Sequence, residues 1–235
     1  MKFDDMRKEE GKVSMRKVLI TGGSRGIGKA TAEKFRSCGY EVTAPARQEL
    51  NLTDGSSIAA FIEKNKDVYF DVIVNNAGCN DIHEIEDITD EEIDQMIALN
   101  LVAPIKLIRG FAGKMKENLY GRIVNIGSIW AVVSKPGRCV YSATKNGIHG
   151  VTNTMAVELA PYNILVNTVC PGFTMTELTR KNNTPEQIAE ISKDIPMQRM
   201  AEPSEMAEVI YFLCSEQNTY LTGQKITVDG GFSEK

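Results

Sequence analysis

A glycine-rich turn between a short apolar segment and a helix-forming segment constrains the fold of this chain more than any other feature. Residues 17–20 read Lys-Val-Leu-Ile, and residues 21–28 read Thr-Gly-Gly-Ser-Arg-Gly-Ile-Gly. A buried strand, a glycine turn and a helix in this order bind phosphate in dinucleotide-binding domains, because the helix N-terminus offers free N–H groups and a positive dipole end. The glycines (Gly22, Gly26 and Gly28) depart from the usual G-x-G-x-x-G spacing. The turn predicts a site for the diphosphate of a nucleotide.

The rest of the chain alternates short apolar segments with segments of helical character. Strands are expected at residues 17–20, 41–46, 70–75, 121–127, 164–169 and 225–228. This alternation predicts an α/β fold with a doubly wound parallel sheet, here as a single Rossmann-type domain over residues 15–235. Ligands of such sheets bind outside the carboxyl ends of the strands. Thr21, Asn75, Ser128 and Pro171 stand at such ends and are expected to cluster.

Composition and charge exclude several classes of function. The net charge of −4 and the scattered basic residues argue against nucleic-acid binding. Five cysteines lie far apart without a Cys-x-x-Cys pair, which favours reduced thiols in a cytoplasmic protein and no metal site. Residues 1–14 are charged and lack an apolar run, so we expect a flexible arm rather than a signal peptide. No later segment approaches the roughly 20 apolar residues of a membrane span.

Tyr141 and Lys145 lie four residues apart in a segment of helical character, so their side chains share one helix face. A free tyrosine has a pKa of about 10, and a nearby ammonium is expected to lower it by favouring the phenolate. A phenol tuned in this way exchanges a proton with a carbonyl or alcohol oxygen. The same spacing also fits an ordinary pair on a helix surface, and the pair alone leaves both interpretations open.

Two arginines bear on the choice of cofactor. In this architecture the second strand ends near the adenosine ribose, where an acid binds the 2′-hydroxyl of NAD and a base suits the 2′-phosphate of NADP. The expected strand runs into Pro45, Ala46 and Arg47, with no acid at its tip, and Arg25 lies in the glycine turn. We therefore expect NADP to be favoured and NAD to remain an alternative. Both arginines also fit simple solvated surface positions.

Further residues carry a resemblance to a known family. Asn-Asn-Ala-Gly follows a buried strand, Asn100 interrupts a long helix, Ser128 precedes Tyr141 by thirteen positions, and a Pro-Gly-x-x-x-Thr run begins at Pro171. Together with the glycine turn, the order and spacing of these residues resemble the short-chain dehydrogenase/reductase family from about Lys17 to Phe232. Within that family the chain is most similar to 3-oxoacyl-acyl-carrier-protein reductases and related ketone reductases.

The resemblance implies a role for each matching residue. Tyr141 would be the acid/base, Lys145 would lower its pKa and bind the nicotinamide ribose, and Ser128 would hold the substrate oxygen. Asn100 would anchor a water that links Lys145 to solvent. The implied cofactor contacts, apart from Tyr141 and Lys145, are Gly22, Ser24, Arg25, Gly26, Ile27, Gly28, Arg47, Asn51, Leu52, Asn76, Ala77, Gly78, Pro171, Gly172, Thr174 and Thr176.

One departure from the family pattern affects the cofactor prediction. Family members join the second and third strands by a full helix, whereas here only a few residues separate Ala46 from Leu50. A parallel crossover needs a dozen residues or more. We therefore expect this helix to be missing and the third strand to be reduced or lost. The pocket for the ribose is built from this connection, so the NADP preference depends on how the shortened segment folds.

The leading function is reduction of a carbonyl to an alcohol, or the reverse, with NADP. The substrate is expected to be a small molecule or an acyl group on its carrier, with a sugar, sugar nucleotide or polyol as the alternative. A non-catalytic nucleotide-sensing protein is the alternative from another class. The family's usual dimer faces, near residues 89–116 and 142–160, imply a homotetramer or homodimer. The polar residues 173–200 are expected to form a substrate lid.

Overall fold

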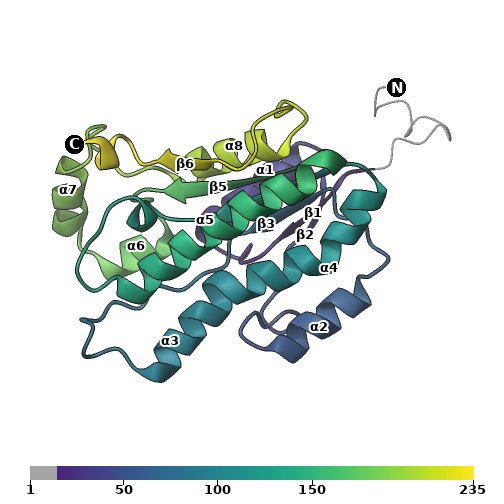
Figure 1. The fold of residues 1–235 in the computed structure, drawn as a ribbon. Coiled ribbons are helices and arrows are strands. Elements are labelled where there is room, and N and C mark those ends of the chain that lie inside the picture. The colour runs from purple at the N-terminus through teal and green to yellow at the C-terminus, as the bar shows by residue number, and fades with distance from the viewer. Residues whose placement is uncertain (1–14) are drawn as a thin grey trace.

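Six parallel strands form one sheet in the order β2-β1-β3-β4-β5-β6 (Figure 1), which confirms the expected α/β fold. A computed structural model describes residues 15–235, apart from the side chains of residues 178 and 182, so the arm expected at residues 1–14 lies outside the described part. The strands are β1 (Lys17–Ile20), β2 (Glu41–Thr43), β3 (Val72–Asn75), β4 (Gly121–Ile126), β5 (Ile164–Pro171) and β6 (Lys225–Val228).

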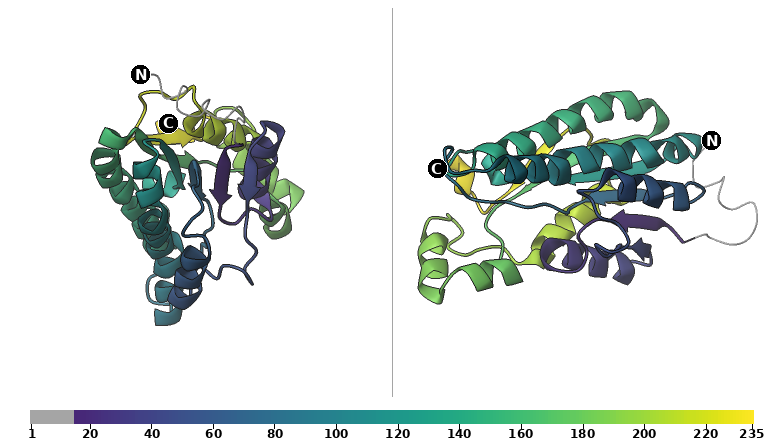
Figure 2. Two further views of the ribbon diagram at one scale, coloured as in Figure 1. Left: turned by 90° about the vertical axis from the view of Figure 1, so that its right-hand side faces the viewer. Right: turned by 90° about the horizontal axis from the view of Figure 1, so that it is seen from below.

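Helices cover both faces of the sheet, as the views in Figure 2 show. One face carries α2 (Gly55–Lys64), α3 (Asp90–Ile97), α4 (Ala103–Glu117) and α5 (Cys139–Leu159). The other face carries α1 (Gly26–Ser37) and α8 (Pro203–Cys214), and α6 (Glu177–Asn182) and α7 (Pro185–Lys193) lie near the carboxyl ends of the strands. This arrangement of helices on both faces makes the sheet doubly wound.

Alternating strand residues divide the core into two clusters. Leu19 and Ile73 point into the cluster under α2, α4 and α5, whereas Val18 and Val74 point into the cluster under α1 and α8. Successive strand side chains face opposite sides of a sheet, so a strand buried on both faces must be apolar throughout. This explains why β1 and β3 read as largely continuous apolar runs.

The connection after β2 contains neither helix nor strand in residues 44–54. The strand ends at Thr43 rather than at the expected residue 46, and Pro45 has no N–H group to extend the ladder. The turn is held by Glu49, whose carboxylate accepts a hydrogen bond from the Ala46 N–H (2.9 Å), and by Leu50, which is buried in the core. Among the described residues, β2 is therefore the edge strand of the sheet, and the chain passes directly into α2.

Helices α3 and α4 run as one continuous helix through a π-helical turn, Ala98–Val102. Its start is fixed by the predicted capping box of Thr89 and Glu92. By length and mean hydropathy, this helix would also suffice to cross a bilayer, which corrects the expectation that no segment does. Core helices of globular proteins meet the same test, and here Phe111 and Met115 pack fully buried against the sheet.

We expect Gly110→Ala to destabilise the protein by about 1–3 kcal/mol, because overpacking forces neighbours to move. A Cβ at Gly110 in α4 would lie 2.7–2.9 Å from the Ile62 side chain of α2. The control is Gly113→Ala in the same helix, where nothing lies within 4 Å of the added carbon. That change should stabilise by about 0.5–1 kcal/mol, because alanine is the better helix former. Denaturant unfolding measures both, and equal midpoints would contradict this packing.

Candidate active site

The side chains of Ser128, Tyr141 and Lys145 meet at the carboxyl edge of the sheet. Ser128 follows β4, and Tyr141 and Lys145 lie one turn apart on α5, which begins at Cys139, earlier than expected. The Ser128 hydroxyl is close enough to the Tyr141 phenol to lower its pKa, and Lys145 is only 4% exposed. The predicted catalytic side chains are thus brought together, with a hydroxyl and a phenol facing the same point.

The pKa of Tyr141 is raised, so its net shift is opposite to the one expected from the sequence. Burial of the phenol has the largest effect and outweighs the hydrogen bond from Ser128 and the positive charge of Arg138, both of which lower the pKa. Lys145 instead donates a hydrogen bond from Nζ to the Ile126 carbonyl oxygen (2.7 Å), and its Nζ lies 5.6 Å from the Tyr141 ring centroid. Tyr141 therefore keeps its proton at neutral pH and is a proton donor.

Burial also changes Lys145 itself. Removing its ammonium from water lowers its pKa to about 8, because desolvation disfavours the charged form. A group with this pKa is still mostly charged at pH 7, and it loses its charge in a mildly alkaline solution. Lys145 is thus a buried cation that loses its charge as the pH rises through about 8.

Asn100 lies in the π-helical turn and joins three segments of the site. Its Nδ2 donates to the Cys79 carbonyl oxygen (2.9 Å) and to Thr144 Oγ1 (3.2 Å), and its Oδ1 accepts from the Cys79 N–H (3.0 Å). Single π-helical turns occur frequently at functional sites. A Cβ at Gly78 would lie 3.1 Å from Asn100 Oδ1 and 3.5 Å from Lys145 Nζ, so glycine there leaves room for both side chains. Asn100 therefore sets the position of the turn beside Lys145.

The glycine turn packs against the turn that follows β3. Thr21 Oγ1 accepts hydrogen bonds from the N–H groups of Asn76 (3.0 Å) and Ala77 (3.1 Å). A Cβ at Gly28 would lie only 2.2 Å from the Gly22 carbonyl oxygen, and Gly22 has a φ of +66° that favours glycine. The N-cap residue of α1, Arg25, makes no side-chain cap. The first N–H groups of α1 are thus presented by a tight backbone, which suits the binding of a diphosphate.

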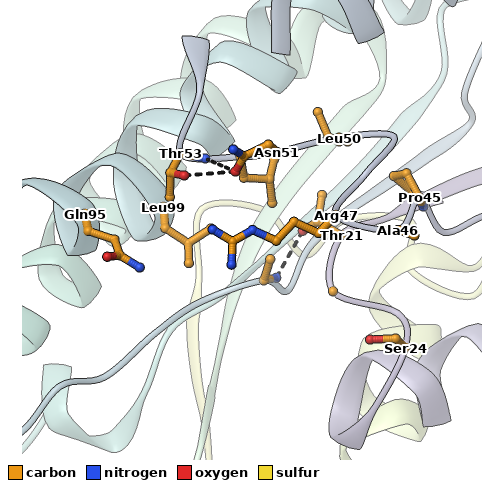
Figure 3. Close-up of a pocket in the computed structure, with 13 residues that line it drawn as sticks. Thr21, Ser24, Pro45, Ala46, Arg47, Leu50, Asn51, Thr53, Gln95 and Leu99 are labelled. Atoms are coloured by element: carbon orange, nitrogen blue, oxygen red, sulfur yellow. Dashed lines mark hydrogen bonds between the residues drawn. The ribbon is translucent and has the colours of Figure 1, made fainter. Parts of the chain in front are cut away.

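A cavity of about 200 Å³ opens beside this turn (Figure 3). Its lining residues are Thr21, Gly22, Ser24, Pro45, Ala46, Arg47, Leu50, Asn51, Leu52, Thr53, Ala77, Gln95 and Leu99. Six of the predicted cofactor residues lie in this lining, and they are Gly22, Ser24, Arg47, Asn51, Leu52 and Ala77. The side chain of Arg47 extends across the cavity toward Leu99 (Figure 3). Arg25 is exposed and does not line the cavity, so the two arginines are not equivalent.

The segment after β5 reaches the glycine turn from the other side. Thr176 is the N-cap of α6, and a Cβ at Gly26 would lie 3.2 Å from its methyl group. The Glu177 carboxylate accepts a hydrogen bond from the Gly26 N–H (3.1 Å). Gly172 packs against Asp229 so closely that a Cβ would lie 2.6 Å from its backbone. The structure therefore brings Thr176 and Glu177 to the N-terminus of α1, and it places Gly172 against Asp229.

Sequence reasoning missed two groups of residues. Gln95 and Leu99 line the cavity from the continuous α3–α4 helix, and only their spacing of four, on the helix that holds Asn100, hinted at a shared face. Arg138 lies three residues before Tyr141 and lowers its pKa, but no motif marked it. Both depend on how distant segments pack.

The chain is similar to known proteins over most of its length. Residues 22–233 match a family model described as enoyl-(acyl carrier protein) reductase. A curated relative, the 3-oxoacyl-[acyl-carrier-protein] reductase of Thermotoga maritima, is 37% identical over 94% of this chain and 98% of its own.

Two solved structures are also similar. ElxO with NADP bound shares 29% identity with a TM-score of 0.88, covering 94% of this chain and 100% of its own. 4-Hydroxyisoleucine dehydrogenase in complex with NADH shares 26% identity with a TM-score of 0.88, covering 94% of this chain and 99% of its own. The chain belongs to the short-chain dehydrogenase/reductase family, and it is an NAD(P)-binding oxidoreductase that interconverts carbonyl and alcohol groups.

Proposed function

We propose that this protein reduces a ketone to an alcohol with NADPH, or runs the reverse oxidation, as a small-molecule or 3-oxoacyl-acyl-carrier-protein reductase of the cytoplasm. The observation that carries the proposal is that Ser128, at the end of β4, and Tyr141 and Lys145, one turn apart on α5, lie at the same edge of the sheet. These groups lie at the edge of the sheet where the glycine turn and the cavity also open. A proton donor beside a nucleotide site is the arrangement that such a reduction needs.

The residues present fit an NADP cofactor. The N-terminus of α1 and the glycine turn would hold the diphosphate, and Asn51, Leu52 and Ala77 would line the adenosine side of the cavity. Residues 171–176 would hold the nicotinamide end. When bound, the reduced cofactor supplies the hydride.

The side chains supply the rest of the chemistry. Ser128 donates a hydrogen bond to the substrate oxygen and holds it against Tyr141. As the carbonyl carbon gains the hydride, the C=O π electrons move to oxygen, which takes the phenol proton of Tyr141 and becomes a hydroxyl. Tyr141 is left as a phenolate, and the nearby charges of Lys145 and Arg138 stabilise it. Lys145 also binds the ribose hydroxyls, and Asn100 anchors the water through which Tyr141 regains a proton.

Residues 173–200 are proposed as a lid over the substrate. Helices α6 and α7 lie in this segment, and its base is pinned by a parallel bridge between Thr174 and Ala201. The contact of Glu177 with Gly26 links the lid to the phosphate-binding turn. Because a carboxylate and a diphosphate repel each other at one helix N-terminus, cofactor binding would displace Glu177 and move the lid.

Assembly into a homotetramer, or at least a homodimer, is proposed from the apolar surface of the α3–α4 and α5 helices. Ile105 is 41% exposed and Val157 is 79% exposed, although both are large apolar side chains. A closed symmetric assembly that pairs these helices would remove them from water.

Tyr141→Phe is expected to lower turnover by about 10²–10⁴, the usual contribution of general acid–base catalysis. NADPH affinity should change little, since the ring remains. Steady-state assays on a panel of ketones, with cofactor binding followed by fluorescence, measure both. The control is Tyr220→Phe, because Tyr220 is 93% exposed and outside the site. Equal turnover in the two variants would remove Tyr141 from the mechanism.

Arg47→Ala is expected to weaken NADPH binding and to leave NADH binding almost unchanged. Arg47 crosses the cavity, where its guanidinium would pair with a 2′-phosphate. Because the cavity is open to water, an ion pair between Arg47 and the 2′-phosphate is weakened by solvent. We therefore expect the wild type to prefer NADPH over NADH by only about ten- to a hundredfold, where each factor of ten corresponds to about 1.4 kcal/mol. Titrations with both cofactors measure this preference.

The matched control is Arg25→Ala, since Arg25 lies on the exposed N-cap of α1 and should matter less. A wild type with equal or better kcat/KM for NADH would show that the shortened connection has built a different ribose pocket.

The kcat/KM for NADPH is expected to fall as the pH rises through about 8. Burial lowers the pKa of Lys145 to about 8, so its ammonium loses charge there and no longer stabilises the phenolate that forms on Tyr141. This ratio reports ionisations of the free enzyme, which is the state described here. Initial rates across the pH range measure it, with cofactor stability checked in parallel. No decline between about pH 7 and pH 9 would rule out a role for the Lys145 charge.

A further inference from the structure

The substrate side of the site contains a guanidinium without an acidic partner. Arg138 is the N-cap residue of α5, and its guanidinium carbon lies 5.6 Å from the centroid of the Trp130 ring. Its Nε and Nη1 atoms are buried and have no hydrogen-bond partner. Among the ion pairs of residues 15–235, none includes Arg138. The Nε and Nη1 donors of Arg138 therefore have no acceptor within the part of the folded protein that the structure describes.

A second buried arginine shows what a structural role looks like in this protein. Arg122 in β4 donates to the carbonyl oxygens of Gly121 (2.8 Å), Asn163 (2.9 Å) and Asn218 (3.2 Å). Buried guanidinium donors normally find such acceptors, because an unpaired buried polar group is costly. Arg122 leaves its Nε without a partner, whereas the half-buried Arg138 leaves both Nε and Nη1 without one, so the cost of burying these two donors is not offset inside the protein. An acceptor that arrives from outside would offset it.

The surroundings of Arg138 define what kind of molecule would bring that acceptor. Trp130 packs edge-on against Phe173 (6.0 Å between centroids) and Phe232 (6.3 Å), and all three rings are half-buried. These three side chains form an aromatic wall beside Ser128, whose hydroxyl accepts a hydrogen bond from the Trp130 N–H of the backbone. A ligand here meets a cation, an apolar wall and the Ser128–Tyr141 pair together.

The cation and the reacting group are close to each other. The charge of Arg138 is near enough to Tyr141 to lower the pKa of the phenol, and burial lowers the pKa of Arg138 itself. Trp130 also connects the two, because Arg138 lies over its ring and its backbone N–H donates to Ser128 Oγ, so an anionic group held by Arg138 would lie on the Ser128 side of the site. The guanidinium of arginine matches a carboxylate in geometry, because its planar fork donates two parallel hydrogen bonds to the two carboxylate oxygens.

We propose that Arg138 binds a carboxylate of the substrate, so that the enzyme selects oxo acids and their hydroxy acids over neutral ketones and esters, which narrows the proposed function to its small-molecule alternative. The inference rests on the proposed function, since it concerns the substrate of the same site. Arg138 is a specificity-determining residue in this account, with the aromatic wall packing on the carbon chain. Binding of the carboxylate by Arg138 would hold the ketone of the same substrate at a fixed position relative to Tyr141.

The test compares a 3-oxo carboxylate with its methyl ester, which differs by the negative charge. The wild type should have a kcat/KM at least tenfold higher for the carboxylate. Arg138→Gln should lower that value by about ten- to a hundredfold, mostly through KM, and change the value for the ester less than threefold, because a charge-assisted bond is lost only with the acid. Arg138→Lys should recover part of the difference, since it keeps the charge without the fork. The control is Lys135→Gln, because Lys135 is exposed beside the same tryptophan ring.

A second readout separates this inference from the proposed function. Trp130 is the only tryptophan of the chain, so its fluorescence reports binding beside Arg138 without turnover. Titration with the 3-hydroxy carboxylate should change the fluorescence of the wild type and not of Arg138→Gln, even if the chosen acid is not turned over. Equal losses for acid and ester in Arg138→Gln, or a fluorescence response that Arg138→Gln retains, would overturn the assignment. Reduction of neutral ketones would still support the proposed function in that case.

Discussion

Burial of one face of α5 against the sheet is the constraint on which the rest of the site depends. It removes Lys145 from water, directs its ammonium to the Ile126 carbonyl oxygen and encloses the Tyr141 phenol beside Ser128. The parallel topology then brings the ends of β1, β3, β4 and β5 to the same edge. The cofactor cavity, the proton donor and the proposed lid therefore lie along one edge of the sheet because of how the helix and strands pack.

Much of this arrangement could be predicted from the sequence, because local rules decide it. Apolar runs give the strands, the capping box of Thr89 and Glu92 starts a helix, and Thr184 with Gln187 starts α7. The glycine turn and the spacing of Ser128 from Tyr141 indicate where the chemistry lies. These features depend on residues that are close in the sequence. The parallel topology then brings the strand ends to one edge of the sheet.

The remaining features depend on contacts between distant segments, which local patterns do not encode. The sign of the Tyr141 pKa shift follows from burial, whereas the i,i+4 spacing indicated only the opposing charge. The π-helical turn at Asn100 follows from its bonds to Cys79 and Thr144. Arg138 has no motif, and its unpaired donors become visible only when the packing around Trp130 is known. Arg47 and Arg25 looked alike in sequence, but only Arg47 lines the cavity.

The central claim of this account is that burial keeps Tyr141 protonated at neutral pH and so makes it the proton donor. An ultraviolet titration of the free wild-type enzyme, from which the titration of Tyr141→Phe is subtracted, isolates the ionisation of this one phenol. The account predicts a midpoint above the ordinary value of about 10, because desolvation outweighs the charge of Arg138 and the bond from Ser128. A midpoint near or below neutral pH would show a phenolate in the resting enzyme and contradict it.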